Sequence, residues 1–378
     1  MRAALLILLL ASALRTGAAT LTLIAPVDYQ VIQRESWGSG FIQITGELSE
    51  GAGTADTVEV RIITEGATNK WEKLSGAVQG LKIGGKVRAP AGGWHRVEVR
   101  VTNAGNALAE AAVEHVGIGE VFVVTGQSNS GNHGEEKQST STGLVSASDG
   151  KGWRLANDPQ PGASGGRGSF MPPLGDALAT RFKVPIGFIA CGAGGTSVRE
   201  WLPKGATFTN PPTVLGNVQQ RADGQWESKG RLFENLVARM KQAGPNGFRA
   251  VLWHQGESDA NQADPTRTLA GSLYREYLGT VIRESRREIG WRAPWFVALA
   301  SYHVPGDEGS PDIRDAQSSL WKDGTALEGP DSDALKGSLR ENGGQGVHFS
   351  GPGLREHAAR WVDKVAPWLE QQNNLEHP

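Results

Sequence analysis

The protein has 378 residues, a formal net charge of -2 and 38% hydrophobic residues, enough for one large hydrophobic core and a smaller one. The charge is nearly balanced. The chain has neither the basic stripe that nucleic-acid binding requires nor a polybasic segment that would hold it on an anionic membrane. Nucleic acid and the membrane surface are therefore excluded as partners.

Residues 1–19 have the layout of a secretory signal peptide. Arg2 precedes an apolar run over residues 3–14, and small residues follow at 17–19. About a dozen apolar residues are too few to span a bilayer. We therefore expect cleavage near Thr20, export to the periplasm or the extracellular space, and no membrane association of the mature protein.

Two strand patterns divide the rest of the chain near residue 116. Residues 20–116 alternate short β-branched runs with glycine-rich turns and show no helical period, which predicts an antiparallel, β-sandwich-like accessory domain. Residues 117–378 contain continuous apolar runs that suit parallel strands covered on both faces. The runs of the first part are 41–45, 57–64 and 95–102, and those of the second are 121–124, 186–190, 250–253 and 295–300.

Amphipathic helical segments alternate with the second set of runs. Apolar residues recur at helical spacing in 232–240, 269–281 and 353–369. Alternation of strand and helix predicts an α/β domain with a doubly wound parallel sheet in three layers, of the flavodoxin-like kind. Ligands of such sheets bind outside the carboxyl ends of the strands. The polar interval 130–168 is expected to be a loop that borders this site.

Three polar segments directly follow three of the predicted parallel strands. Residues 125–132 contain Ser128, and residues 191–197 contain glycines that let backbone N–H groups approach a ligand closely. Residues 253–259 are rich in side chains that donate or accept hydrogen bonds. The three segments are expected to converge at one edge of the sheet. Cys191, the only cysteine, is expected to be buried rather than to act as a thiol nucleophile.

This combination suits ester hydrolysis with Ser128 as the nucleophile, although Ser128 taken alone would be read as a turn or N-cap serine. Ester hydrolysis requires an activated hydroxyl and donors placed about 3 Å from the developing oxyanion. Candidate donors are the Ser128 amide, an amide of Gly194 or Gly195, and the Gln255 side chain. The general base must come from elsewhere, and His348, just before the last helical segment, is the candidate.

The same segments resemble the four sequence blocks of the SGNH hydrolases, in the sialate O-acetylesterase-like branch. The match covers roughly residues 119–369, and its blocks are Gly126-Gln127-Ser128-Asn129, Gly194-Gly195-Thr196, residues 253–258 and His348. The resemblance implies that Ser128 is the nucleophile and His348 the base. It also implies an oxyanion hole built from the amides of Ser128 and Gly195 and the side chain of Gln255.

One position departs from the family pattern. The family usually places an aspartate three residues before its histidine, and Gln345 stands there in this chain. A carboxylate orients the imidazole and stabilises its cationic form, so we expect a Ser-His dyad or an atypical triad. The partner of His348 is the Gln345 side chain, a backbone carbonyl, or the carboxylate of Glu257 or Asp259. We favour a carbonyl-type acceptor and expect Glu257 mainly to brace its own loop.

Other residues are candidates for contacting the substrate or for structural roles. Sugar rings stack on aromatic planes, and Trp153, Trp201 and Trp226 lie in expected loops. The further candidates for substrate contact are Gln127, Asn129, Gly194, Thr196 and His303. No pair of histidines has a zinc-binding spacing, so no metal and no cofactor is expected. His357 is expected on the solvated face of the last helix.

The sequence thus predicts a carboxylic ester hydrolase that removes acetyl groups from a carbohydrate through an acyl-enzyme. Two alternatives stay open: a non-catalytic carbohydrate-binding relative, and an esterase or lipase for non-carbohydrate esters. Motif spacing does not fix the sugar, which includes sialic acid and plant or microbial polysaccharide fragments.

Overall fold

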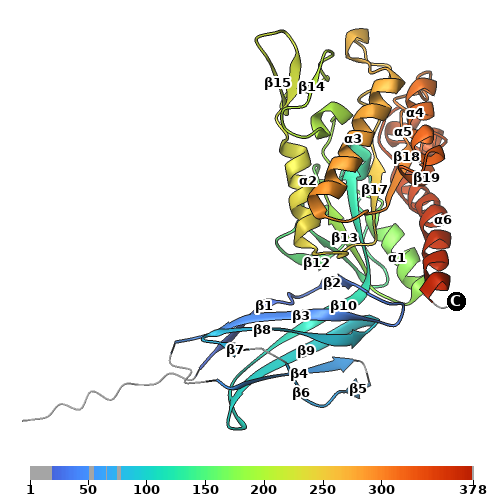
Figure 1. Ribbon diagram of the computed structural model, residues 1–378. Coiled ribbons are helices and arrows are strands. Elements are labelled where there is room, and N and C mark those ends of the chain that lie inside the picture. The colour runs from blue at the N-terminus through green and yellow to red at the C-terminus, as the bar shows by residue number, and fades with distance from the viewer. Residues whose placement is uncertain (1–18, 51–54, 65, 75–77, 377–378) are drawn as a thin grey trace, which may run out of the picture.

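The computed structural model describes residues 19–50, 55–64, 66–74 and 78–376, and it consists of a β-rich N-terminal part beneath a larger part of strands and helices (Figure 1). Residues 1–18 of the predicted signal peptide lie outside the described residues. Within the described ranges, no helix combines the length and the apolar character needed to cross a membrane.

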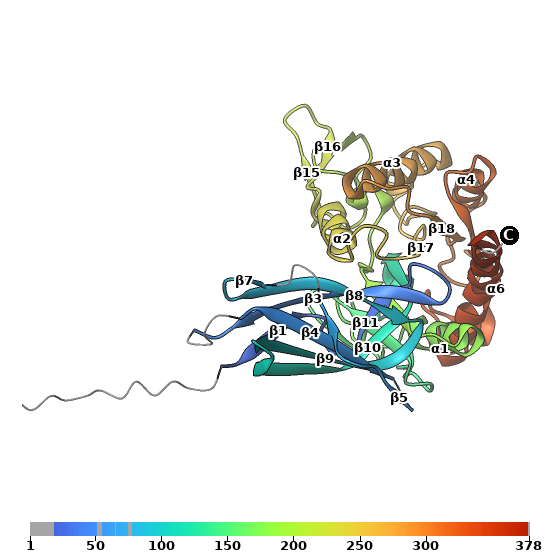
Figure 2. The ribbon, with the colours of Figure 1, turned by 60° about the horizontal axis from the view of Figure 1, so that its bottom comes forward.

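Two sheets form the N-terminal part, and Figure 2 shows them lying one above the other. The first has the order β1-β3-β8-β7 and consists of β1 (Leu21–Ala25), β3 (Ser39–Leu48), β8 (Lys82–Pro90) and β7 (Val78–Gln79). The second contains β2 (Gln30–Gln33), β4 (Thr57–Thr64), β5 (Ala67–Thr68), β6 (Glu72–Lys73), β9 (Gly92–Asn103) and the first half of β10 (Asn106–Gly126).

Buried and more exposed residues alternate along β3 and β4, because successive side chains of a strand point to opposite faces. The inward-facing residues of both sheets form one apolar cluster that includes Ile42, Val58 and Val99. β2 pairs with β10 in parallel, so the expectation of a purely antiparallel arrangement is wrong at this strand.

The strand β10 joins the two parts of the molecule. It is 21 residues long and runs without interruption through the expected boundary at residue 116. Its second half is buried throughout. Gly119 is required where β10 passes beneath Pro185, since a Cβ at this position would lie 1.9 Å from the Pro185 carbonyl oxygen.

The upper sheet has the order β12-β11-β13-β10-β17-β18-β19. Its neighbours pair in parallel from β11 to β19, and β12 adds an antiparallel edge. The further strands are β11 (Val145–Ser148), β12 (Trp153–Leu155), β13 (Ile186–Ala190), β17 (Ala250–His254), β18 (Trp295–Leu299) and β19 (Leu327–Asp331). The four predicted parallel strands are present. β11 and β12 were not expected, because they lie in the polar interval read as a loop.

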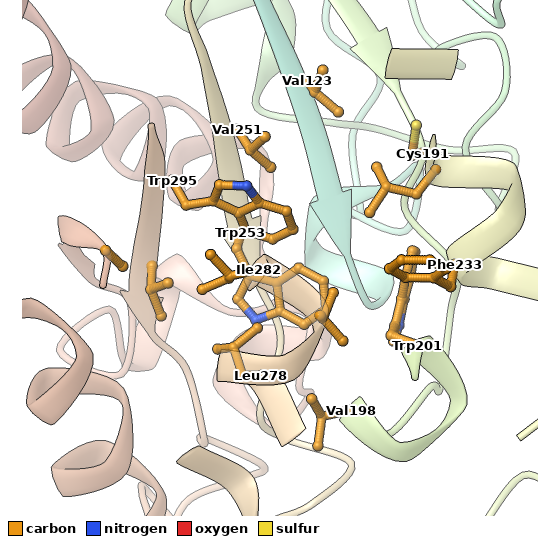
Figure 3. Packing of buried hydrophobic residues seen from close by; sticks show 14 of the residues in the cluster. Val123, Cys191, Val198, Trp201, Phe233, Val251, Trp253, Leu278, Ile282 and Trp295 are labelled. Atoms are coloured by element: carbon orange, nitrogen blue, oxygen red, sulfur yellow. The ribbon is translucent and has the colours of Figure 1, made fainter. Parts of the chain in front are cut away.

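Helices cover both faces of this sheet. One face carries α2 (Arg231–Gln242), α3 (Gly271–Ile289) and α4 (Pro311–Lys322), and the other carries α1 (Met171–Phe182) and α6 (Gly351–Glu376). Val123 of β10 lies in the first core next to Val251, and Trp295 lies beyond Val251 on β18 (Figure 3). Phe122, the neighbour of Val123, lies in the second core. The protein is therefore a mixed α/β fold built on one large mixed sheet.

Short strands and short helices lie at the carboxyl edge of the parallel strands. A small sheet of order β14-β16-β15 is inserted before α2. The short strands and helices are β14 (Thr207–Phe208), β15 (Val218–Gln220), β16 (Trp226–Ser228), η1 (Ser128–Ser130), η2 (Val198–Trp201), η3 (Pro265–Arg267), η4 (Gly337–Leu339) and α5 (Glu341–Gly344).

Candidate active site

Ser128 begins a tight turn at the carboxyl end of β10. Gly126 ends the strand with a φ of 126°, and a Cβ there would lie 2.1 Å from the His254 carbonyl oxygen, so only glycine fits. η1 is closed by hydrogen bonds from the Ser130 amide to the Gln127 carbonyl and from the Gly131 amide to the Ser128 carbonyl, both 2.9 Å. The turn fixes the backbone of Ser128, which is 5% exposed.

The residues on either side of Ser128 brace this turn from within the protein. Gln127 is buried, and its Oε1 accepts from the amide of Ser258 at 3.0 Å. Asn129 is also buried, and its Nδ2 donates to Glu257 Oε1 at 2.9 Å and to the Val347 carbonyl at 3.3 Å. Both side chains, which were candidates for substrate contact, are held by protein groups.

His348 is paired with Glu341. The Nδ1 of His348 lies 2.6 Å from Glu341 Oε1, and the His348 amide donates to the same oxygen at 3.2 Å. The Glu341 amide donates to the His348 carbonyl at 2.9 Å, which folds residues 341–348 into a closed loop. A Cβ on residue 346 would lie 2.2 Å from Glu341 Cγ, so Gly346 makes room for this carboxylate.

The expected partners of His348 contact other groups. The Gln345 side chain is exposed and has no hydrogen bond among those of the described residues. Glu257 contacts Asn129, and Asp259 accepts from Ser197. The preference for a carbonyl-type acceptor is therefore wrong. Glu341, seven residues before His348, was not among the partners expected from the sequence.

The second polar segment, residues 191–197, is connected to His348 by way of Ser164 and His133. The Gly194 amide donates to Ser164 Oγ at 2.6 Å, and Ser164 Oγ lies 3.0 Å from His133 Nε2. The His133 ring stacks on His348 with centroids 5.3 Å apart. Burial, followed by the charge of His348, lowers the pKa of His133. These contacts connect the second segment to His348, and the hydrogen bond from Asn129 to the Val347 carbonyl connects the first.

Gly195 and Gln255 differ in what they can offer an oxyanion. Gly195 is exposed with a φ of 71°, and neither its amide nor that of Ser128 donates a hydrogen bond found among the described residues. Gln255 is fully buried, and its Nε2 donates to Asp259 Oδ2 at 2.6 Å and to the Thr196 carbonyl at 3.1 Å. Its amide hydrogens are occupied, which contradicts the expected role of Gln255 in an oxyanion hole.

Three further candidates for substrate contact form hydrogen bonds with other protein groups. Thr196 is buried and accepts from Trp201 Nε1 at 3.0 Å, and Trp201 is 1% exposed and packs against Trp253. Trp201 therefore has no open face for a sugar ring. The two nitrogens of His303 lie 2.6 Å from Asp307 Oδ2 and 2.6 Å from the Glu257 carbonyl. The other two loop tryptophans lie in strands, Trp153 in β12 and Trp226 in β16.

A buried polar network extends from Asn129 to α6. His254 Nε2 lies 3.3 Å from Glu257 Oε1, and His254 Nδ1 lies 3.0 Å from His357 Nε2. Burial acts to raise the pKa of Glu257, but the charge of His254 and the Asn129 hydrogen bond outweigh it and bring the pKa to about 2. His357 is 0% exposed, so its expected place on a solvated face is wrong.

Cys191 is the other candidate nucleophile of the chain. Cys191 is buried, and burial raises the pKa of its thiol, which disfavours the thiolate needed for nucleophilic attack. The part of the chain that the structure describes contains no group of three or more His, Cys, Asp or Glu side chains suited to a metal ion.

Several solved structures resemble this fold. A carbohydrate acetylesterase from Xanthomonas citri shares 20% identity, with a TM-score of 0.50 over 90% of this chain and 74% of that chain. A protein from Arabidopsis thaliana shares 20% identity, with a TM-score of 0.44 over 65% of this chain and 96% of that chain. The structure of NanS shares 16% identity, with a TM-score of 0.44 over 67% and 98%. At these identities the likeness concerns the fold.

The sequence pattern of one family, described as carbohydrate esterase, sialic acid-specific acetylesterase, matches residues 118–365. No curated protein sequence matches the chain. The family match defines the class of the protein as a carboxylic ester hydrolase. The chain belongs to the sialic acid-specific acetylesterase family of carbohydrate esterases.

Proposed function

We propose that Ser128, His348 and Glu341 form a catalytic triad that hydrolyses O-acetyl esters of carbohydrates. The observation that carries the proposal is the 2.6 Å contact between Glu341 Oε1 and His348 Nδ1, because it supplies the carboxylate that the family's usual position lacks. A carboxylate in this place fixes the tautomer with hydrogen on Nδ1 and leaves Nε2 free to take a proton.

The reaction then follows acyl-transfer chemistry. Ser128 Oγ attacks the acetyl carbonyl carbon while His348 Nε2 takes the hydroxyl proton. Collapse of the tetrahedral intermediate breaks the bond to the sugar oxygen, which leaves with that proton and yields an acetyl-enzyme. Water then gives a proton to His348 and attacks the acetyl carbonyl carbon. The bond to Ser128 Oγ breaks, Ser128 takes the proton back from His348, and acetic acid leaves and ionises to acetate.

The described hydrogen bonds do not join Ser128 Oγ to His348 directly. The support for their pairing is Asn129, which follows Ser128 in the chain and donates to the carbonyl of Val347, the residue before His348. In apo structures catalytic hydrogen bonds are often longer than in the substrate complex.

The oxyanion hole consists of the Ser128 and Gly195 amides in this proposal. Both are free of protein acceptors among the described residues, whereas the Gly194 amide and the Gln255 side chain are occupied. Val214, which is 40% exposed, lies next to Gly195 and gives the acetyl group or the sugar an apolar neighbour. The substrate is an O-acetylated carbohydrate, with acetylated sialic acid as the first candidate because the family description names it.

We also propose that the protein is exported and that its parts divide near residue 116. The apolar run and small residues of segment 1–19 support export. The two sheets of residues 20–116 have a core of their own, which supports an accessory domain that β10 joins to the esterase domain.

Acetate release tests the function against its two alternatives. Residues 20–378 and the Ser128→Ala variant are incubated with a chromogenic acetate, a chromogenic octanoate, acetylated sialic acids and acetylated plant oligosaccharides. We expect acetate from at least one sugar acetate, preference for acetyl over octanoyl, and no release by the variant. Preference for octanoate would support an esterase of non-carbohydrate esters. Sugar affinity without any acetate release would support a binding protein.

A further inference from the structure

The three residues of the proposed triad have chain neighbours that meet at one atom, the carbonyl oxygen of Val347. Val347 precedes His348. Asn129, which follows Ser128, donates its Nδ2 to this oxygen at 3.3 Å, and Arg340, which precedes Glu341, donates its Nη1 to it at 2.7 Å. One carbonyl therefore connects the nucleophile turn, the carboxylate and the base.

We propose that Asn129 and Arg340 are positioning residues that hold His348 in register with Ser128 and Glu341 through the Val347 carbonyl. This inference rests on the proposed triad. In this inference the two buried polar side chains act on catalysis through His348, without touching the substrate or the reacting atoms.

Arg340 is built as a rigid anchor. Arg340 is 1% exposed, and its guanidinium donates to three carbonyl oxygens, those of Leu335 at 2.6 Å, Ser332 at 2.7 Å and Val347. The guanidinium carbon lies over the rings of Tyr302 and Phe349, 4.1 and 4.4 Å from their centroids. A planar fork of this kind has donors in fixed directions, which a lysine ammonium on a flexible stem does not reproduce.

Asn129 is equally constrained. Its Nδ2 carries two hydrogens, and the structure supplies two acceptors, Glu257 Oε1 and the Val347 carbonyl. Glu257 is buried and faces His254 at 3.3 Å, so the first hydrogen is held by a fixed carboxylate and the second is directed at Val347. An aspartate at position 129 would offer no such donor and would face Glu257 with like charge.

The arrangement matters because proton transfer depends on sub-ångström placement. Displacement of a catalytic group by about 1 Å can cost a factor of about 100 in rate. His348 is held on one side by Glu341, but that pair can move together as one loop. The contacts to Val347 join the loop to the nucleophile turn and, through Arg340, to the segment that follows β19.

The test compares Asn129→Ala, Arg340→Lys and the double variant with Arg286→Lys as a matched control. Arg286 is a half-buried arginine that also donates to carbonyl oxygens, those of Ala293 at 2.9 Å and Thr325 at 3.1 Å, but it lies in α3 near the opposite end of β18. For each variant kcat, KM and the melting temperature are measured with the substrate that wild type hydrolyses, and Ser128→Ala is measured alongside.

We expect kcat to fall about 10- to 100-fold in each single site variant, with KM within about threefold and a melting temperature well above the assay temperature. The double variant should lose less than the product of the single losses, because both residues act on one carbonyl. Wild-type kcat in Asn129→Ala would overturn the inference, as would kcat losses matched by Arg286→Lys. If Arg340→Lys does not fold, Asn129→Ala alone decides. Activity retained by Ser128→Ala would instead refute the proposed triad.

Discussion

At the scale of single residues, the main prediction is that catalysis depends on the carboxylate of Glu341. Glu341→Gln keeps the size of the side chain but removes the charge that stabilises the His348 imidazolium. By analogy with an aspartate-to-asparagine change in a serine protease triad, kcat should fall roughly 10³- to 10⁴-fold. The measurement is kcat on a chromogenic acetate, with the melting temperature as a check on folding.

Gln345→Ala is the matched control for this variant, since Gln345 lies in the same loop but its side chain is exposed. Its kcat should stay within about twofold of wild type. If Gln345→Ala were as damaged as Glu341→Gln, the loop as a whole and not the carboxylate would be what matters.

The residues that the sequence could predict are those carried by local motifs. Ser128 and His348 were proposed from segments that follow a strand or precede a helix, and the structure brings those segments together. Glu341 could not be found in this way because its contact depends on a turn in which Asn342 and Gly343 have left-handed backbone angles. Gln255 was misassigned because its motif does not reveal that Asp259 binds its amide group.

At the scale of elements, the cap of η2 predicts a pH dependence of stability. Glu200 accepts from the Ser197 amide at 2.9 Å and from Asn217 Nδ2 at 3.0 Å. Burial raises the pKa of Glu200 to about 7, from 4.5 for an ordinary glutamate. The folded state therefore binds more protons than the unfolded state between these values, so this group's contribution to stability falls as the pH rises through that window.

Glu200→Gln stays neutral and should lack this fall. The difference in free energy of unfolding, wild type minus variant, should decrease by on the order of 3 kcal/mol from pH 4 to pH 8. Urea unfolding at both pH values measures it. An unchanged difference would mean that the folded protein does not hold Glu200 in its protonated form.

Elements were predictable where their apolar pattern was strong. The buried runs of β13 and β17 and the amphipathic face of α2 were identified within a few residues, whereas α6 was expected to end at residue 369 and continues to Glu376. β11 was missed, although all four of its residues are buried, because its small residues, two of them serines, lack the apolar signal of a strand. The burial of His357 depends on its contacts with His254 and Trp361, which helical spacing does not predict.

At the scale of the whole molecule, a buried ion cluster connects the two parts. Glu120 of β10 is 0% exposed and lies 2.6 Å from Arg34 Nε and 2.7 Å from Arg249 Nε. Arg34 follows β2 of the N-terminal part, and Arg249 precedes β17 of the upper sheet. Removal of one partner from a buried ion cluster leaves uncompensated charge behind.

Glu120→Gln should therefore lower the free energy of unfolding by about 3–5 kcal/mol, measured by urea denaturation. Glu328→Gln is the control, because Glu328 pairs with Lys364 on the surface and should cost little. Equal effects of the two substitutions would contradict a structural role of the cluster. The sequence did not predict this connection, since no pattern revealed that β10 continues through residue 116.

The central claim is that Ser128 accepts the acetyl group with His348 and Glu341 as its catalytic partners. The most direct measurement is mass spectrometry of peptides from protein quenched in acid during turnover of a chromogenic acetate. We predict an acetyl group on the peptide that contains Ser128, and none on that peptide in Ser128→Ala. Acetate release with acetylation at another residue, or with no acetylated peptide under conditions that slow deacylation, would contradict the account.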